Sequence, residues 1–117
     1  MLYSAVMHPT TIYKICPEAL WREAEAAGRF DGAPIDHADG FIHFSTGEQV
    51  HETATRHFAG GEDLLLVAVS TDGLDIKWEP SRGGALFPHL YAPLPLTSVI
   101  WARNLSLVDG VYMIPER

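Results

Sequence analysis

Hydrophobic and polar positions at the start of the chain predict a strand followed by a helix. The segment TIYKIC (11–16) is rich in β-branched and aromatic residues, which favour strands. Pro17 suits the first turn of a helix, where its missing N–H would have no partner anyway. Apolar residues then recur at helical spacing, and Gly28 is a typical helix end. The apolar helix positions are Leu20, Trp21, Ala24 and Ala27.

A second strand and a second helix are predicted in the next thirty or so residues. The segment 29–40 combines three Gly or Pro residues with four Asp or His residues, and we expect an irregular polar loop. FIHFS (41–45) follows as a strand. Thr46 with Gln49 three residues later resembles a capping box. It would start a helix that ends at Gly60–Gly61 and carries Val50, Ala54, His57 and Phe58.

The second half of the chain is predicted to be mainly strands. DLLLVAVS (63–70) is apolar on both faces, which is typical of a central strand. Further strands are expected at 75–79, 98–104 and 111–114. The segment 80–96 is so rich in proline and glycine that we expect a long irregular loop, and such loops are often functional. This order of elements predicts an α+β fold in a single domain spanning 1–117.

Composition and charge narrow the classes of function. Eight basic and fifteen acidic residues give a formal net charge of −7, which argues against non-specific binding to nucleic acid or to an anionic membrane. The single cysteine cannot form an intramolecular disulfide. No apolar stretch is long enough to span a bilayer, and the N-terminus does not resemble a signal peptide. We therefore expect a cytoplasmic protein.

The proline-rich segment and the residues just before it hold most of the candidate chemistry. Arg82 beside two glycines could offer a guanidinium and backbone N–H groups to a phosphate. Alternatively, Glu79 and Arg82 pair with each other and the glycines only form a turn. His89 and Tyr91 would share one face of an extended segment. They could bind a planar ring, or they could hold the loop to the core by hydrogen bonds.

The end of the 41–45 strand is the other candidate. His43 and Ser45 share a face, and a strand end that meets a helix N-terminus is a common ligand site. A hydrogen-bonded core histidine is the alternative interpretation of His43. The six histidines do not have the spacing of zinc ligands, so no metal is expected. Cys16 is interpreted as a small buried residue and not as a nucleophile.

Several longer motifs, taken together, carry a family resemblance. GFIHFST and WEPSRGGALFPHLY are the most specific of them, and IYKI, LWREAEAAGRF, DLLLVAV and PLPLTSVIWAR accompany them in order. The chain resembles the bacterial family called "domain of unknown function 952" from about residue 11 to residue 110. The resemblance implies an ADP-ribosyltransferase-like fold. Such a fold has split, twisted, mostly antiparallel sheets with two main helices, and a cleft that holds NAD in active transferases.

The resemblance also implies roles for particular residues. Lys14 would lie on the first strand, where a transferase offers Arg or His to the ribose and phosphates. His43, Ser45 and Thr46 would form the hydroxyl-bearing strand end beside the nicotinamide. Glu79 would bind the ribose 2′-hydroxyl and stabilise the developing oxocarbenium ion.

These observations lead to one functional expectation and one alternative. We expect the cleft to bind NAD or a related nucleotide-type small ligand, with Glu79 and His43 as catalytic residues if the protein is an enzyme. The remaining ligand-binding residues would be Lys14, Ser45, Thr46, Ser81, Arg82, His89 and Tyr91. The alternative is a non-catalytic interaction or structural module, as a monomer or a homodimer, that keeps the fold without the chemistry.

Overall fold

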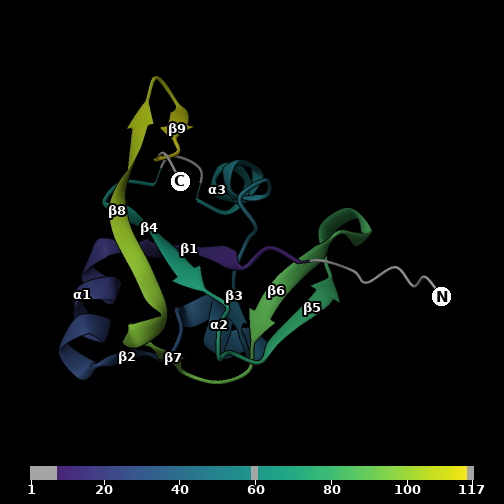
Figure 1. Cartoon of the computed structure of the whole chain (residues 1–117). Coiled ribbons are helices and arrows are strands. Elements are labelled where there is room, and N and C mark those ends of the chain that lie inside the picture. Colours follow the sequence, from purple (N-terminus) through teal and green to yellow (C-terminus); the bar gives the residue numbers. More distant parts are fainter. Residues whose placement is uncertain (1–7, 59–60, 116–117) are drawn as a thin grey trace.

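Antiparallel sheets with a few short helices make up the computed structural model, which describes residues 8–58 and 61–115 (Figure 1). The side chain of Arg82 lies outside the described part as well. The α+β prediction is confirmed. The helices are α1 (Glu18–Ala27), α2 (Pro34–Asp39) and α3 (Val50–His57), with 3₁₀ turns at Arg82–Gly84 and Leu96–Ser98. The strands are β1 (Thr11–Pro17), β2 (Arg29–Phe30), β3 (Ile42–His43), β4 (Leu64–Ser70), β5 (Ile76–Pro80), β6 (Leu86–Leu90), β7 (Leu94–Pro95), β8 (Val99–Val108) and β9 (Val111–Met113).

The main sheet has the strand order β1-β4-β8-β9, and β4 lies between β1 and β8 as predicted. β4 is apolar on both faces because each face packs into a core of its own. Leu65, Val67 and Val69 join one core together with Trp21 and other residues. Leu64, Leu66 and Ala68 join the other. A strand that is buried on both faces needs a continuous apolar run, and this explains the LLLVAV sequence.

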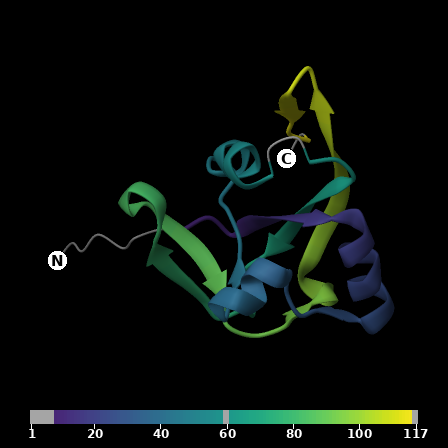
Figure 2. The same ribbon diagram turned by 180° about the vertical axis from the view of Figure 1, so that it is seen from behind.

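A second sheet, of order β3-β6-β5, is joined to the first through the segment after β3. Within it, His43 pairs directly with His89 across β3 and β6. Ser45 then forms an isolated bridge to Tyr13 on β1, with both backbone N–H···O distances at 2.8 Å. The two sheets therefore meet along the inner edge of β1. Figure 2 shows α2 and the β5–β6 hairpin on one side of this junction and α1 on the other.

Helix α1 agrees closely with its predicted limits. Trp21 and Ala24 are buried, and Gly28 adopts the left-handed conformation at φ 84° while its N–H donates to the carbonyl of Ala24. The capping-box interactions of Thr46 and Gln49 also form, at 3.0 and 3.3 Å. They close a turn before α3, which begins at Val50 and ends at His57. Of the predicted end at Gly60–Gly61, Gly60 lies outside the described residues.

The prediction that 29–40 is irregular was wrong. This segment contains β2 and the six-residue helix α2, so the chain has one helix more than the two that were expected. Pro34 and Gly40 are the reason. Pro34 occupies the first turn of α2, and Gly40 ends it in the left-handed conformation at φ 83°. Residues that favour loops in isolation therefore act here as the start and stop signals of a helix.

The prediction that 80–96 is irregular was also wrong, because this segment includes β6 and β7. Pro88 lies inside β6, where it pairs with Trp78 of β5. The carbonyl of Pro88 points toward β3 and accepts from the N–H of Phe44 at 3.0 Å. The proline nitrogen faces the same side, and there the regular β3 pairing stops at His43 and His89. The missing N–H therefore coincides with the end of the β3–β6 ladder.

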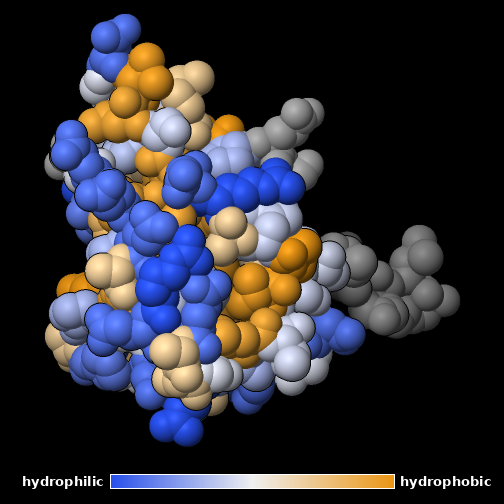
Figure 3. All heavy atoms as spheres, turned by 90° about the vertical axis from the view of Figure 1, so that its left-hand side faces the viewer, coloured by the Kyte–Doolittle hydropathy of each residue, from blue (hydrophilic) through white to orange (hydrophobic). Residues whose placement is uncertain are grey.

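The outer end of the main sheet carries exposed apolar residues. Val108, Val111 and Met113 of the β8–β9 hairpin are each about half exposed. Figure 3 shows the side of the molecule near α1, which is largely hydrophilic. Groups of hydrophobic atoms interrupt this surface, and one group lies at the upper end, where Figure 1 places the hairpin. The described helices include none that is both long and apolar enough to cross a membrane.

Because β4 is buried on both faces, truncation on either face should be equally harmful. We expect Leu65→Ala and Leu66→Ala each to lower the free energy of unfolding by about 2–5 kcal/mol, as measured by urea denaturation. Leu86→Ala on an exposed position of β6 is the matched control and should cost less than about 1 kcal/mol. A small effect of Leu66→Ala would contradict the second core.

Candidate functional site

A pocket of about 560 Å³ lies at the junction of the two sheets. Its walls come from β1, α2, β3, α3 and β6, together with the residues that follow β3 and precede β6. Half of the lining residues are apolar and half are polar or charged, although apolar atoms make up most of the lining surface. The polar and charged lining residues are Lys14, Asp39, His43, Ser45, Thr53, His57, Ser81 and His89.

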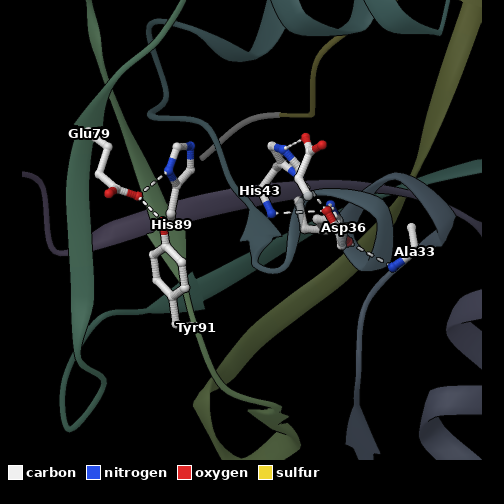
Figure 4. A network of polar contacts seen from close by, with 8 residues as sticks. Ala33, Asp36, His43, Glu79, His89 and Tyr91 are labelled. Atoms are coloured by element: carbon white, nitrogen blue, oxygen red, sulfur yellow. Dashed lines mark hydrogen bonds and ion pairs between the residues drawn. The ribbon is translucent and has the colours of Figure 1, made fainter.

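The buried carboxylate of Asp36 organises one wall of this pocket (Figure 4). Its Oδ1 lies 2.9 Å from Lys14 Nζ and accepts from the backbone N–H of His43 at 3.0 Å. The ring Nδ1 of His43 is 2.6 Å from the same oxygen. Oδ2 accepts from the backbone N–H of Ala33 at 2.7 Å and lies 2.9 Å from Lys14 Nζ. One side chain thus connects β1, α2 and β3.

Burial and mutual contact shift the pKa values of Asp36 and Lys14. Burial alone raises the pKa of Asp36, but the hydrogen bond from His43 and the positive charge of Lys14 outweigh it and lower the pKa to about 2. Burial lowers the pKa of Lys14, and the charge of Asp36 opposes that change. A buried ammonium needs such a partner, because an isolated charge in the interior is very costly.

Both ring nitrogens of His43 face carboxylates. Nδ1 contacts Asp36 at 2.6 Å, and Nε2 contacts Oδ2 of Asp39 at 2.8 Å. An ionised carboxylate can only accept hydrogen bonds, so both nitrogens must carry protons when both acids are ionised. Only an imidazolium could therefore donate to both carboxylates at once.

His89 belongs to a second polar group on the facing strands. Its Nδ1 lies 2.7 Å from Oε1 of Glu79, and the hydroxyl of Tyr91 donates to the same oxygen at 2.6 Å (Figure 4). These bonds from Tyr91 and His89 lower the pKa of Glu79, and the carboxylate raises the pKa of Tyr91. Phe41 stacks on the His89 ring at a centroid distance of 4.1 Å and also contacts the rings of His43 and Tyr91.

The structure brings together five of the nine predicted site residues. Lys14, His43, Ser45, Ser81 and His89 line the pocket. The hydroxyl of Ser45 lies 2.9 Å from that of Thr53 on α3, so it is already engaged in a hydrogen bond.

Of the other four predicted residues, Thr46, Glu79 and Tyr91 do not line the cavity. Thr46 uses its hydroxyl to accept from the N–H of Gln49 and is not among the lining residues. Glu79 and Tyr91 also lie outside the lining: the Tyr91 hydroxyl donates to Glu79, and Glu79 contacts His89. The side chain of Arg82 lies outside the described residues, and its pairing with Glu79 stays a prediction.

Sequence reasoning missed Asp36, Asp39 and Phe41. Asp36 sits two residues after Pro34, in the first turn of a helix, where an acidic residue commonly accepts a backbone N–H. That pattern was a usable signal for a helix start. It gave no sign that the carboxylate would be buried against a lysine from β1.

Metal and thiol chemistry find little support in the described part of the chain. There, no group of three or more His, Cys, Asp or Glu side chains is arranged to hold a metal ion. Burial raises the pKa of the Cys16 thiol to about 11, which leaves it protonated and unreactive at neutral pH.

Comparison with known families identifies the chain. The model of the family described as "Protein of unknown function (DUF952)" matches residues 15–102. The chain belongs to this family. The resemblance seen in the sequence motifs is thereby confirmed for the family itself. A search of curated proteins finds no match.

The chain is also similar to a protein of known structure. The chain is similar to the crystal structure of protein CC0527 from Caulobacter crescentus, with 52% identity and a TM-score of 0.84, over 89% of this chain and 94% of that one. The solution NMR structure of CC0527 matches with 53% identity and a TM-score of 0.79, over 88% and 91% of the two chains.

Removing the charge of Asp36 should destabilise the protein strongly, because it leaves the Lys14 ammonium buried without a partner. We expect Asp36→Asn to lower the free energy of unfolding by about 3–5 kcal/mol in urea denaturation. Adding Lys14→Met should restore part of this loss, since the uncompensated charge is gone. A double variant that is less stable than Asp36→Asn alone would contradict the role assigned to the ion pair.

Acid should weaken the fold through the same carboxylate. The pKa of Asp36 is about 2 in the folded protein and 3.8 ordinarily. Its contribution, about 2 kcal/mol, is therefore complete above pH 4 to 5 and is lost as the pH falls toward 2. Urea denaturation between pH 6 and pH 3 should show this loss in the wild type. Asp36→Asn should lack this part of the dependence, and identical pH profiles would refute the assignment.

Proposed function

We propose that the pocket binds a nucleotide-type small ligand, with NAD and its relatives as the first candidates. One observation carries the proposal: a mostly apolar cavity of about 560 Å³ is lined by three imidazoles, and those of His43 and His89 are each held by a carboxylate. Cavities of roughly 300–1,000 Å³ with apolar walls and a few fixed polar groups are typical of small-molecule sites.

The polarity of the walls suggests how such a ligand would lie. A planar ring and a ribose suit the interior, where Phe44, Phe58 and Phe87 alternate with hydroxyl and imidazole groups. Ser81 is exposed and lies at the rim, next to the turn at Arg82–Gly84. In this proposal the phosphates point toward that turn, where Arg82 would meet them.

An ADP-ribosyltransferase-like arrangement is part of the proposal. The division into two sheets around a pocket supports it, as does the position of Lys14 on the first strand facing that pocket. Glu79 takes a different part from the one implied by the family resemblance, because its carboxylate contacts His89 and Tyr91. In our proposal Glu79 is a positioning residue and acts on the ligand through His89.

A non-catalytic structural module is the second candidate, and one observation favours it. The charges around His43 are satisfied within the protein, by Asp36 on one ring nitrogen and Asp39 on the other. Such a closed network is what a purely structural role requires. The two candidates differ in a measurable way, because only the first predicts saturable binding in the pocket.

Titration by calorimetry and by NMR chemical-shift mapping tests the proposal. We expect NAD, ADP-ribose or nicotinamide riboside to bind with a Kd on the order of 1 mM or tighter. The shifted signals should cluster on the pocket residues. The exposed substitution Ser81→Trp places a bulky ring at the rim and should weaken binding by about tenfold or more.

Ser106→Trp provides the matched control, because Ser106 is exposed on β8 of the other sheet. It should leave the affinity unchanged. If none of the three compounds binds at millimolar concentration, the ligand proposal is wrong and the structural module is preferred.

A further inference from the structure

The second ring nitrogen of His89 is the starting point. Ionised Glu79 can only accept hydrogen bonds, so the Nδ1 of neutral His89 must carry the proton. Its Nε2 then bears a lone pair. Among the described residues this nitrogen has no hydrogen-bond partner, although the side chain is only 7% exposed and lines the pocket. In Figure 4 the ring turns this nitrogen away from Glu79.

His43 is the complementary group. Its ring centroid lies 5.6 Å from that of His89, in an edge-on arrangement across β3 and β6. Its two ring nitrogens lie 2.6 Å from Asp36 and 2.8 Å from Asp39, an arrangement in which an imidazolium would donate to both carboxylates. Asp36 is buried, whereas the side chain of Asp39 is 46% exposed and can turn toward solvent. The Nε2 proton is therefore the one that His43 can deliver.

We propose that the pocket is an acid–base site that hydrolyses the N-ribosidic bond of a nucleoside, with His89 as general base and His43 as general acid. This inference rests on the proposed function, because it needs a nucleoside bound in the pocket. The inference goes beyond the proposed function by naming the reaction and the two groups that move protons. A base with an available lone pair and an acid with a transferable proton, side by side, match a reaction that needs both.

The step balances without any other reactant. Water attacks C1′ of the ribose while Nε2 of His89 takes one of its protons, and a new C1′–O bond forms. The C1′–N bond breaks, and its electron pair goes to the leaving nitrogen, which takes the Nε2 proton of His43. The products are ribose and the free base. His89 ends protonated and His43 neutral, and exchange with solvent restores both.

The charges around the histidines favour a neutral substrate. The two cations, Lys14 and the His43 imidazolium, are offset by the carboxylates of Asp36 and Asp39. Among the described residues, no surplus of positive charge stands beside His43 and His89 to hold a phosphate. An uncharged purine or pyrimidine also leaves as an anion unless it is protonated, so it needs the acid. Nicotinamide leaves a pyridinium riboside as a neutral molecule and needs only the base.

Release of the free base, measured by chromatography, tests this assignment. The full-length protein is incubated with inosine and, separately, with nicotinamide riboside. We expect His89→Asn to lower the release of both bases by about 10²–10⁴-fold. We expect His43→Asn to lower hypoxanthine release as much, but nicotinamide release by less than about tenfold. Asparagine can keep a donor near the position of Nδ1, so both variants retain a bond to their carboxylate.

His51→Asn is the control, since His51 is exposed on α3 and does not line the pocket. It should leave both rates unchanged. Nitrogen-15 NMR of the free protein at pH 7 provides an independent readout that does not need a ligand. It should show two protonated ring nitrogens on His43, and on His89 a proton at Nδ1 alone.

The outcomes separate this inference from the binding proposal. If inosine binds and no hypoxanthine is released, the acid–base assignment is wrong and ligand binding stands. A proton on Nε2 of neutral His89, or equal losses of both reactions in His43→Asn, also overturns it. If the three compounds titrated above all fail to bind, the proposed function itself fails.

Discussion

The buried carboxylate of Asp36 is the interaction on which the arrangement of the pocket depends. It receives Lys14 from β1, the N–H before α2, and both the backbone and the ring of His43 on β3. An ammonium at this depth is tolerated only when its counter-charge is correctly placed, because the desolvation penalty is several kcal/mol per ion. The position of α2 against the two sheets is therefore specified by charge as well as by packing.

His43 and His89 illustrate two ways in which a protein can place an imidazole. His43 has both ring nitrogens engaged by carboxylates, Asp36 on one and Asp39 on the other. His89 has one nitrogen fixed by Glu79 and the other directed elsewhere. Phe41 lies against both rings, at centroid distances of 4.5 Å from His43 and 4.1 Å from His89. A fixed ring with one available nitrogen is the form in which histidine acts on ligands in many proteins.

Local patterns predicted the main sheet and α1 well, because β-branched runs and helical spacing agree there with the tertiary environment. They failed at 29–40 and 80–96, where Pro34 and Pro88 have roles that depend on their neighbours in space. The site was predicted in part. His43 and His89 were found because polar groups in apolar strands stand out in a sequence. Asp36 was not, since its importance comes from Lys14, 22 residues away in the chain.

Pro88 has a consequence for how the two sheets share the chain. Because it offers no N–H toward β3, the ladder between β3 and β6 cannot extend much past Phe44. The next residue, Ser45, is thereby released to bond with Tyr13 of β1. At Pro88, therefore, the segment that contains β3 stops pairing with β6 and begins to pair with β1. Beyond that point the two sheets diverge, and the pocket lies between them.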